Sequence, residues 1–194
     1  MLVSTGWVER TQDFAKTLRR RTTEPQGLLL VGTPDAEPWH LAAHLDDESR
    51  WSGVSELSPT LVRYQPPEGA PAHLAVTLKR LERAKRGETL FVVSEDDAPS
   101  ELLERAWDAR KLGATILSLD IGDAELHGVA HESLVVPTTD EIALTTEPQL
   151  DVVSFDNVQH LVSVAAGEAA AAASSRTVRD RMAKLLERIS GPRI

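Results

Sequence analysis

Carboxylates cluster directly after one of the apolar segments of the chain. Ser94 ends the segment at 89–94, and Glu95, Asp96 and Asp97 follow it. Ionised carboxylates accept hydrogen bonds, repel phosphate and favour hard cations such as Mg²⁺. The simpler interpretation, which we adopt, is that these acids mark the start of a helix, where the helix dipole favours negative charge and Asp96 or Asp97 can act as the cap.

Histidines occur twice with a spacing of four residues. His40 and His44 lie in WHLAAH, and His127 and His131 lie in HGVAH. This spacing puts both imidazoles of a pair on one helical face, which is how helices present zinc ligands. An aspartate at 46 or 47 could be a third ligand of the first pair. Neither pair carries the glutamate of the HExxH motif, so we assign no metal ion and no cofactor.

Apolar runs and helical patterns alternate along the chain. Runs without polar alternation indicate strands buried on both faces, and helical patterns of 10–15 residues between them indicate crossovers of a parallel sheet. The sequence therefore predicts an α/β protein, a three-layer αβα sandwich with about five parallel strands. The strands are expected at 27–32, 61–64, 89–94, 114–120 and 133–137, and helices at 4–21, 36–45, 72–86, 123–131, 155–173 and 175–190, with one more helix that has Pro99 in its first turn and ends before Gly113.

Two of these helices carry apolar stripes that predict their buried faces. In the helix at 72–86, Leu74, Leu78 and Leu81 share one stripe. In the helix that ends before Gly113, Trp107 lies on the apolar stripe and is expected in the core.

Composition limits the class of protein. The chain has 194 residues, which suits a single domain: an N-terminal helix (1–26), an α/β core (27–150) and C-terminal helices (151–194). A net charge of −9 argues against binding to nucleic acid or to an anionic membrane surface. The absence of cysteine excludes disulfides and thiolate metal sites.

Targeting and cofactor motifs are absent from the sequence. No apolar run reaches about 18 residues, so no membrane span is expected. Charge enters at Glu9, too early for the apolar region of a signal peptide, so we expect a cytoplasmic protein. No GxGxxG, GxxxxGK[ST] or GxSxG motif occurs, which argues against dinucleotide, P-loop and α/β-hydrolase sites.

The block at 87–137 resembles the sugar isomerase (SIS) domain, a family that binds phosphosugars. The similarity rests on its layout of strand, short loop, helix, Gly113-Ala114, strand and a final apolar segment that ends at Pro137. With the leading GLLLVG and the terminal helices it covers roughly 110 residues. The resemblance implies a flavodoxin-like strand order, with the strands at 27–32 and 89–94 adjacent and a ligand bound beyond their carboxyl ends.

The resemblance also implies the ligand-binding residues, although the pattern departs from that of the family. The family has Ser-x-Ser-Gly-x-Thr after this strand; here Ser94 matches, while Asp96, Asp97 and Pro99 replace the second serine, the glycine and the threonine. Acids replace neutral donors there, which weakens the prediction of phosphate binding. The expected ligand-binding residues are Gly32, Thr33, Ser94, Asp96, Ser100 and Thr145.

Two functional hypotheses follow from this resemblance. The first is a non-catalytic or divergent protein that binds a phosphosugar or another carbohydrate derivative. The second is an active phosphosugar isomerase, in which Glu141 and His160 supply the acid–base groups that aldose–ketose isomerisation requires. The resemblance implies a homodimer under both hypotheses.

Overall fold

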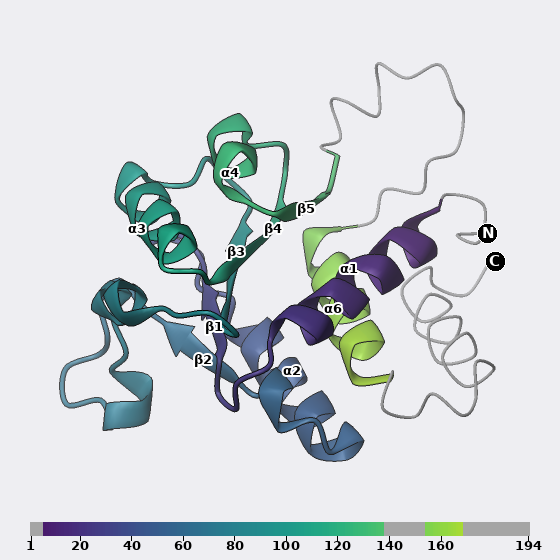
Figure 1. Cartoon of the computed structure of the whole chain (residues 1–194), viewed down its shortest axis with the longest axis horizontal. Helices are drawn as coiled ribbons and strands as arrows, with labels where there is room; N and C mark the ends of the chain where they lie inside the picture. Colours follow the sequence, from purple (N-terminus) through teal and green to yellow (C-terminus); the bar gives the residue numbers. More distant parts are fainter. Residues whose placement is uncertain (1–5, 138–153, 169–194) are drawn as a thin grey trace, which may run out of the picture.

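The computed structural model describes residues 6–137 and 154–168, and a five-stranded parallel sheet forms its centre (Figure 1). The strand order is β2-β1-β3-β4-β5, with every neighbouring pair parallel. This confirms the predicted α/β class and the adjacency of β1 and β3. The strands are β1 (Leu28–Val31), β2 (Pro59–Val62), β3 (Thr89–Ser94), β4 (Thr115–Asp120) and β5 (Glu132–Val135).

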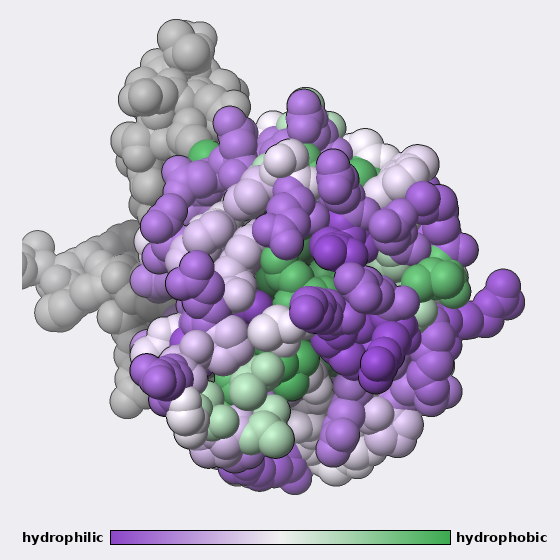
Figure 2. Space-filling model, turned by 90° about the vertical axis from the view of Figure 1, so that its left-hand side faces the viewer, coloured by the Kyte–Doolittle hydropathy of each residue, from purple (hydrophilic) through white to green (hydrophobic). Residues whose placement is uncertain are grey.

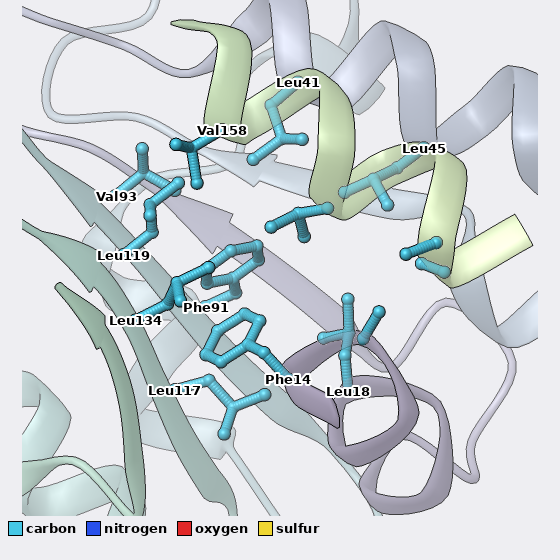
Figure 3. Close-up of a cluster of buried hydrophobic side chains, with 14 of the residues drawn as sticks. Phe14, Leu18, Leu41, Leu45, Phe91, Val93, Leu117, Leu119, Leu134 and Val158 are labelled. Carbon is cyan, nitrogen blue, oxygen red and sulfur yellow. The ribbon is translucent and has the colours of Figure 1, made fainter. Parts of the chain in front are cut away.

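The central strands bury both of their faces. All side chains of β1 and β3 are buried, as their unbroken apolar sequences predict. Successive residues point to opposite sides of the sheet, so each strand contributes to two separate cores. Leu30 and Phe91 belong to one core, whereas Leu29 and Val92 belong to the other. Phe91 packs against Phe14 with ring centroids 5.4 Å apart (Figure 3).

Helices cover both faces of this sheet and complete three layers. One face carries α1 (Trp7–Arg21), α2 (Trp39–Ser52) and α6 (Phe155–Glu168), and α6 packs against both α1 and α2. The other face carries α3 (Ser100–Lys111), α4 (Ala124–Val129) and the 3-10 helix η4 (Leu78–Arg83). Figure 2 views the molecule from the side of α3 and η4, where mostly hydrophilic residues surround a few hydrophobic ones.

The predicted helix at 72–86 is wrong. Two short 3-10 helices, η3 (Ala72–Leu74) and η4, occupy this segment, and the chain is extended at Thr77 between them. There Arg63 donates its backbone N–H to the Val76 carbonyl, so the segment continues the edge of the sheet beyond β2. The β-branched pair Val76 and Thr77 suits this extended pairing better than a helix. Leu74, expected to be buried, is 43% exposed.

The predicted burial of Trp107 is also wrong. Its side chain is 48% exposed, and the guanidinium of Arg110 lies 5.8 Å from the centre of its ring. The buried stripe of α3 consists of Leu102, Ala106 and Ala109, at helical spacings of four and three. Trp107 lies one position past this stripe, where its large ring contacts a neighbouring charged side chain instead of the core.

The remaining helices differ from the sequence expectations mainly in their bounds. Helix α2 runs seven residues beyond the predicted end at 45. Helix α6 matches the start of the predicted helix at 155–173, whereas its end and the helix at 175–190 lie outside the described residues. Among the described helices, none is long and apolar enough to cross a membrane.

Candidate functional site

A pocket of about 290 Å³ opens at the carboxyl ends of β1 and β3. Parallel sheets of this kind bind ligands at this edge, where the strand order reverses. Three parts of the chain contribute to the pocket: the segment that joins β1 to α2 together with the start of α2, the end of β3, and the first turns of α6. The residues that line it are Ala36, Glu37, Pro38, Trp39, His40, Val93, Glu95, Phe155, Asp156 and Gln159.

Carboxylates dominate the polar lining of this pocket. Glu95 comes from the loop directly after β3 and Asp156 comes from α6. Burial, followed by the charges of Asp156 and Asp96, raises the pKa of Glu95. The charge of Glu37 is balanced by Arg63, which does not belong to the described lining and donates from both Nε and Nη2 to the Glu37 carboxylate. The described lining therefore offers hydrogen-bond acceptors and no arginine or lysine.

Apolar rings form the other part of the lining. Trp39 is 66% exposed, although it stands at the start of a helix that packs on the sheet. Phe155 approaches the pocket from the first turn of α6. An exposed indole beside carboxylates is a surface on which an apolar face of a small polar ligand can lie.

The predicted ligand-binding residues of the first turn are used to hold the backbone. The N–H of Thr33 donates to the Ala36 carbonyl, and its Oγ1 accepts from the Ala36 N–H. Gly32 is required here by close approach, since a Cβ at this position would lie 2.1 Å from the Ala36 carbonyl oxygen. These residues therefore shape the turn that leads to the pocket and do not belong to its described lining.

The predicted residues after β3 are divided between the backbone and the surface. Ser94 is buried and donates its hydroxyl to the Asp96 carbonyl. Asp96 and Ser100 are exposed, and neither belongs to the described lining. The expected side-chain cap by Asp96 or Asp97 is wrong, because α3 begins after Pro99 without a side-chain cap.

Asp123 holds the loop after β3 from the neighbouring crossover. Its Oδ2 accepts the Ala98 N–H at 2.8 Å, while its Oδ1 caps α4 through the N–H groups of Glu125 and Leu126. Asp123 is itself buried. The position of Glu95 in the pocket wall therefore depends in part on a residue that the sequence analysis did not single out.

His160 lies on α6 beside the pocket residue Gln159, and its ring packs against His44 of α2 with centroids 4.2 Å apart. His40, which lines the pocket, lies one turn before His44. Burial, His160 and His40 together lower the pKa of His44, in that order of effect, against a smaller opposing effect of Asp47. The other two predicted residues, Glu141 and Thr145, lie outside the described residues.

The second histidine pair does not share a helical face. Helix α4 ends at Val129, so only His127 is helical. His127 Nε2 lies 2.8 Å from Oδ1 of the buried Asp120, and His131 Nδ1 accepts the Ile116 N–H. Both imidazoles are therefore engaged with β4.

Sequence reasoning missed several lining residues, namely Glu37, Trp39, Phe155, Asp156 and Gln159. The first two follow β1 within the segment at 33–39, where loops of this fold class carry ligand contacts, so their position was a usable signal. The other three come from a helix that begins 60 residues beyond Glu95, and only the tertiary fold brings them to the pocket.

Solved structures with the same fold include the sugar isomerase domain of a transcription factor. The sugar isomerase domain of the RpiR transcription factor from Sphaerobacter thermophilus matches 92% of this chain with a TM-score of 0.52 and 14% identity, over 86% of its own length. The Vibrio vulnificus NanR protein complexed with ManNAc-6P matches 91% of this chain with a TM-score of 0.52 and 15% identity. A Salmonella typhimurium protein provisionally assigned as a phosphosugar isomerase matches 84%, with a TM-score of 0.53 and 9% identity.

These comparisons show the fold of the chain, which is that of the SIS domain. The chain spans 60% of the length of the NanR protein and 44% of the Salmonella protein. No protein-family model matches the sequence, and no curated protein matches it.

Proposed function

We propose that this chain is a divergent SIS-fold protein that binds a carbohydrate derivative in the pocket at the β1–β3 edge and does not isomerise it. The observation that carries the proposal is the described lining of that pocket, where Glu95 and Asp156 stand beside the exposed indole of Trp39. Carboxylates accept hydrogen bonds from sugar hydroxyls, and an aromatic ring covers the apolar face of a sugar ring.

The same lining disfavours a phosphate dianion. Two like charges about 4 Å apart repel by about 4 kcal/mol at an effective dielectric constant of 20. The hydroxyls of Thr33 and Ser94 are hydrogen-bonded within their own turns. We therefore expect a neutral or amine-bearing sugar to bind more tightly than its phosphate ester.

Calorimetric titration with paired ligands tests this proposal. Each pair consists of a hexose or hexosamine, with or without an N-acetyl group, and its 6-phosphate. Glu95→Gln and Trp39→Ala should each weaken binding by about 10-fold or more, as expected when a hydrogen bond to a charged group or a buried aromatic contact is lost. Glu104→Gln and Trp51→Ala are the matched controls, since both residues are exposed and lie outside the described lining.

Turnover separates this proposal from the alternative, an active phosphosugar isomerase with Glu141 and His160 as acid–base groups. Conversion of a phosphosugar by the wild-type protein, lost in His160→Ala, would overturn the non-catalytic proposal. Tighter binding of the phosphates than of the parent sugars would overturn the proposed role of the acids. The homodimer expected from the resemblance is a separate proposal, and light scattering on the full chain measures it directly.

A further inference from the structure

Three imidazoles from two helices converge beside the pocket. His40 and His44 project from successive turns of α2, and His160 projects toward them from α6. One ring nitrogen of each histidine lies within 4.8 Å of the corresponding nitrogens of the other two. The histidine pair seen in the sequence therefore acquires its third partner from the opposite helix, and not from the aspartates at 46 and 47.

The packing of α2 against α6 holds the three histidines near one another. Glu48, one turn after His44, lies against Gly167 so closely that a Cβ on the glycine would be 2.0 Å from the Glu48 carboxylate. The contacts of His44 with His160 and of Glu48 with Gly167 follow the same order along both helices, so α2 and α6 run in the same direction at this interface. Figure 3 shows the two helices side by side above the core, held there by Leu41, Leu45 and Val158.

The ring nitrogens of the three histidines are available to a ligand. Within residues 6–137 and 154–168, none of them makes a hydrogen bond or an ion pair, in contrast to His127 and His131. His44 and His160 are half-buried and His40 is exposed, so the cluster is backed by packed helices and open on one side. Asp46, by contrast, is already engaged with Arg50 and with the Ser58 hydroxyl.

We propose that His40, His44 and His160 form a three-histidine site for a divalent transition-metal ion of the zinc type. Imidazole nitrogen is a preferred ligand of such ions, at metal–nitrogen distances of about 2.0–2.1 Å. Ligand nitrogens around a tetrahedral ion are therefore about 3.3 Å apart, which side-chain rotation alone can reach from the present spacing. Three protein ligands leave a fourth position for water or for an atom of a molecule in the pocket, since His40 also lines that pocket.

Binding of Zn²⁺ and Co²⁺ to the full, untagged chain tests this site. After treatment with a chelator, the protein is titrated with Zn²⁺ by calorimetry, and Co²⁺ is added separately to record its ligand-field absorption. The variants are His44→Ala and His160→Ala, and the control is His73→Ala, because His73 is exposed and remote from the cluster in the sequence. Circular dichroism and the melting temperature without metal show whether each variant is folded.

The wild-type protein and the control should bind one Zn²⁺ ion per chain, and Co²⁺ should give the absorption of a four-coordinate ion. Each cluster variant should lose at least about 100-fold in affinity, since even outer-shell partners of a metal site contribute 10–100-fold. Equal affinity in folded wild-type and cluster variants would overturn the site, as would a wild-type chain that binds no Zn²⁺. This result does not depend on sugar binding, because no sugar is present.

Discussion

Replacement of Asp123 by alanine should destabilise the protein by about 2–4 kcal/mol. Asp123 is buried and accepts three backbone N–H groups: two from the first turn of α4 through Oδ1 and one from Ala98 through Oδ2. Loss of a helix cap costs about 0.5–2 kcal/mol, and a buried N–H left without an acceptor costs about 1–3 kcal/mol. The Ala98 N–H is buried by the packing of α3, so water does not replace the carboxylate freely.

Asp123→Asn separates these two contributions. An asparagine side chain has one acceptor oxygen and one donor nitrogen, so it can satisfy either the α4 N–H groups or the Ala98 N–H, but not both. We expect it to destabilise the protein by less than the alanine variant does. Free energies of unfolding from urea denaturation, followed by circular dichroism, measure both changes. Glu125→Gln on the same helix is the control and should shift the free energy by no more than about 0.5 kcal/mol.

Two results would refute this account of Asp123. If the alanine variant loses less than about 1 kcal/mol, the carboxylate does not support two chain segments as the geometry indicates. If alanine and asparagine are equally destabilising, the α4 cap and the Ala98 contact do not contribute separately. The loop that Asp123 holds also carries Glu95, so the alanine variant should weaken ligand binding even where it remains folded.

Glu95→Gln should raise the melting temperature at neutral pH and leave it unchanged in acid. Burial and two neighbouring carboxylates raise the pKa of Glu95 above its ordinary value of 4.5. The stability that the protonated Glu95 contributes is therefore present below pH 4.5 and is lost as the pH rises through the raised pKa. Melting temperatures of both proteins measured across this pH range check the prediction. Gly32→Ala should destabilise the protein by about 1–3 kcal/mol, because the added Cβ would meet the Ala36 carbonyl. Gly128→Ala on α4 should stabilise the protein by about 0.4–1 kcal/mol, because its added Cβ would lie in open space. Urea denaturation measures both free energies of unfolding. Phe91→Ala should cost about 3–5 kcal/mol and Trp107→Ala less than about 1 kcal/mol; similar losses in the two variants would contradict the observed burial.

The sheet could be predicted from local sequence because its strands are buried on both faces. An unbroken apolar run such as LLLV at 28–31 is typical of a strand buried on both faces of a sheet. The spacing between these runs leaves room for a helix, which indicates crossover connections between parallel strands. The helix predicted at 72–86 is wrong because its stripe of three leucines does not exist: only Leu78 and Leu81 are buried, within the 3-10 helix η4. The hydrogen bond from the Arg63 N–H to the Val76 carbonyl is also invisible to sequence periodicity. Trp107 shows the same limit, since one residue of helical rotation separates a buried position from an exposed one.

The candidate site was predictable in place but not in composition. The carboxyl edge of β1 and β3 follows from strand order, whereas Glu95 was noted only as one of three acids at an expected helix start and not as a ligand-binding residue. Asp156 and the meeting of His160 with His44 depend on how α6 crosses α2, which no local pattern encodes. The hydroxyls of Thr33 and Ser94 were predicted from the resemblance to the SIS domain, whereas their use depends on the backbone groups nearest to them.

The packing of α1 on α6 affects the order in which the chain can fold. Arg19 donates to the carbonyl of Ala166 across 147 positions, and the two helices cover the same face of the sheet. A ribosome that adds about 5–20 residues per second synthesises α6 on the order of 10 s after α1. During that time α1 lacks the helix against which it packs in the folded protein. Closing so long a loop is also slow in refolding. Pulsed hydrogen exchange should therefore show protection in β3, β4 and α3 before α1; simultaneous protection would indicate that the early helix docks without its late partner.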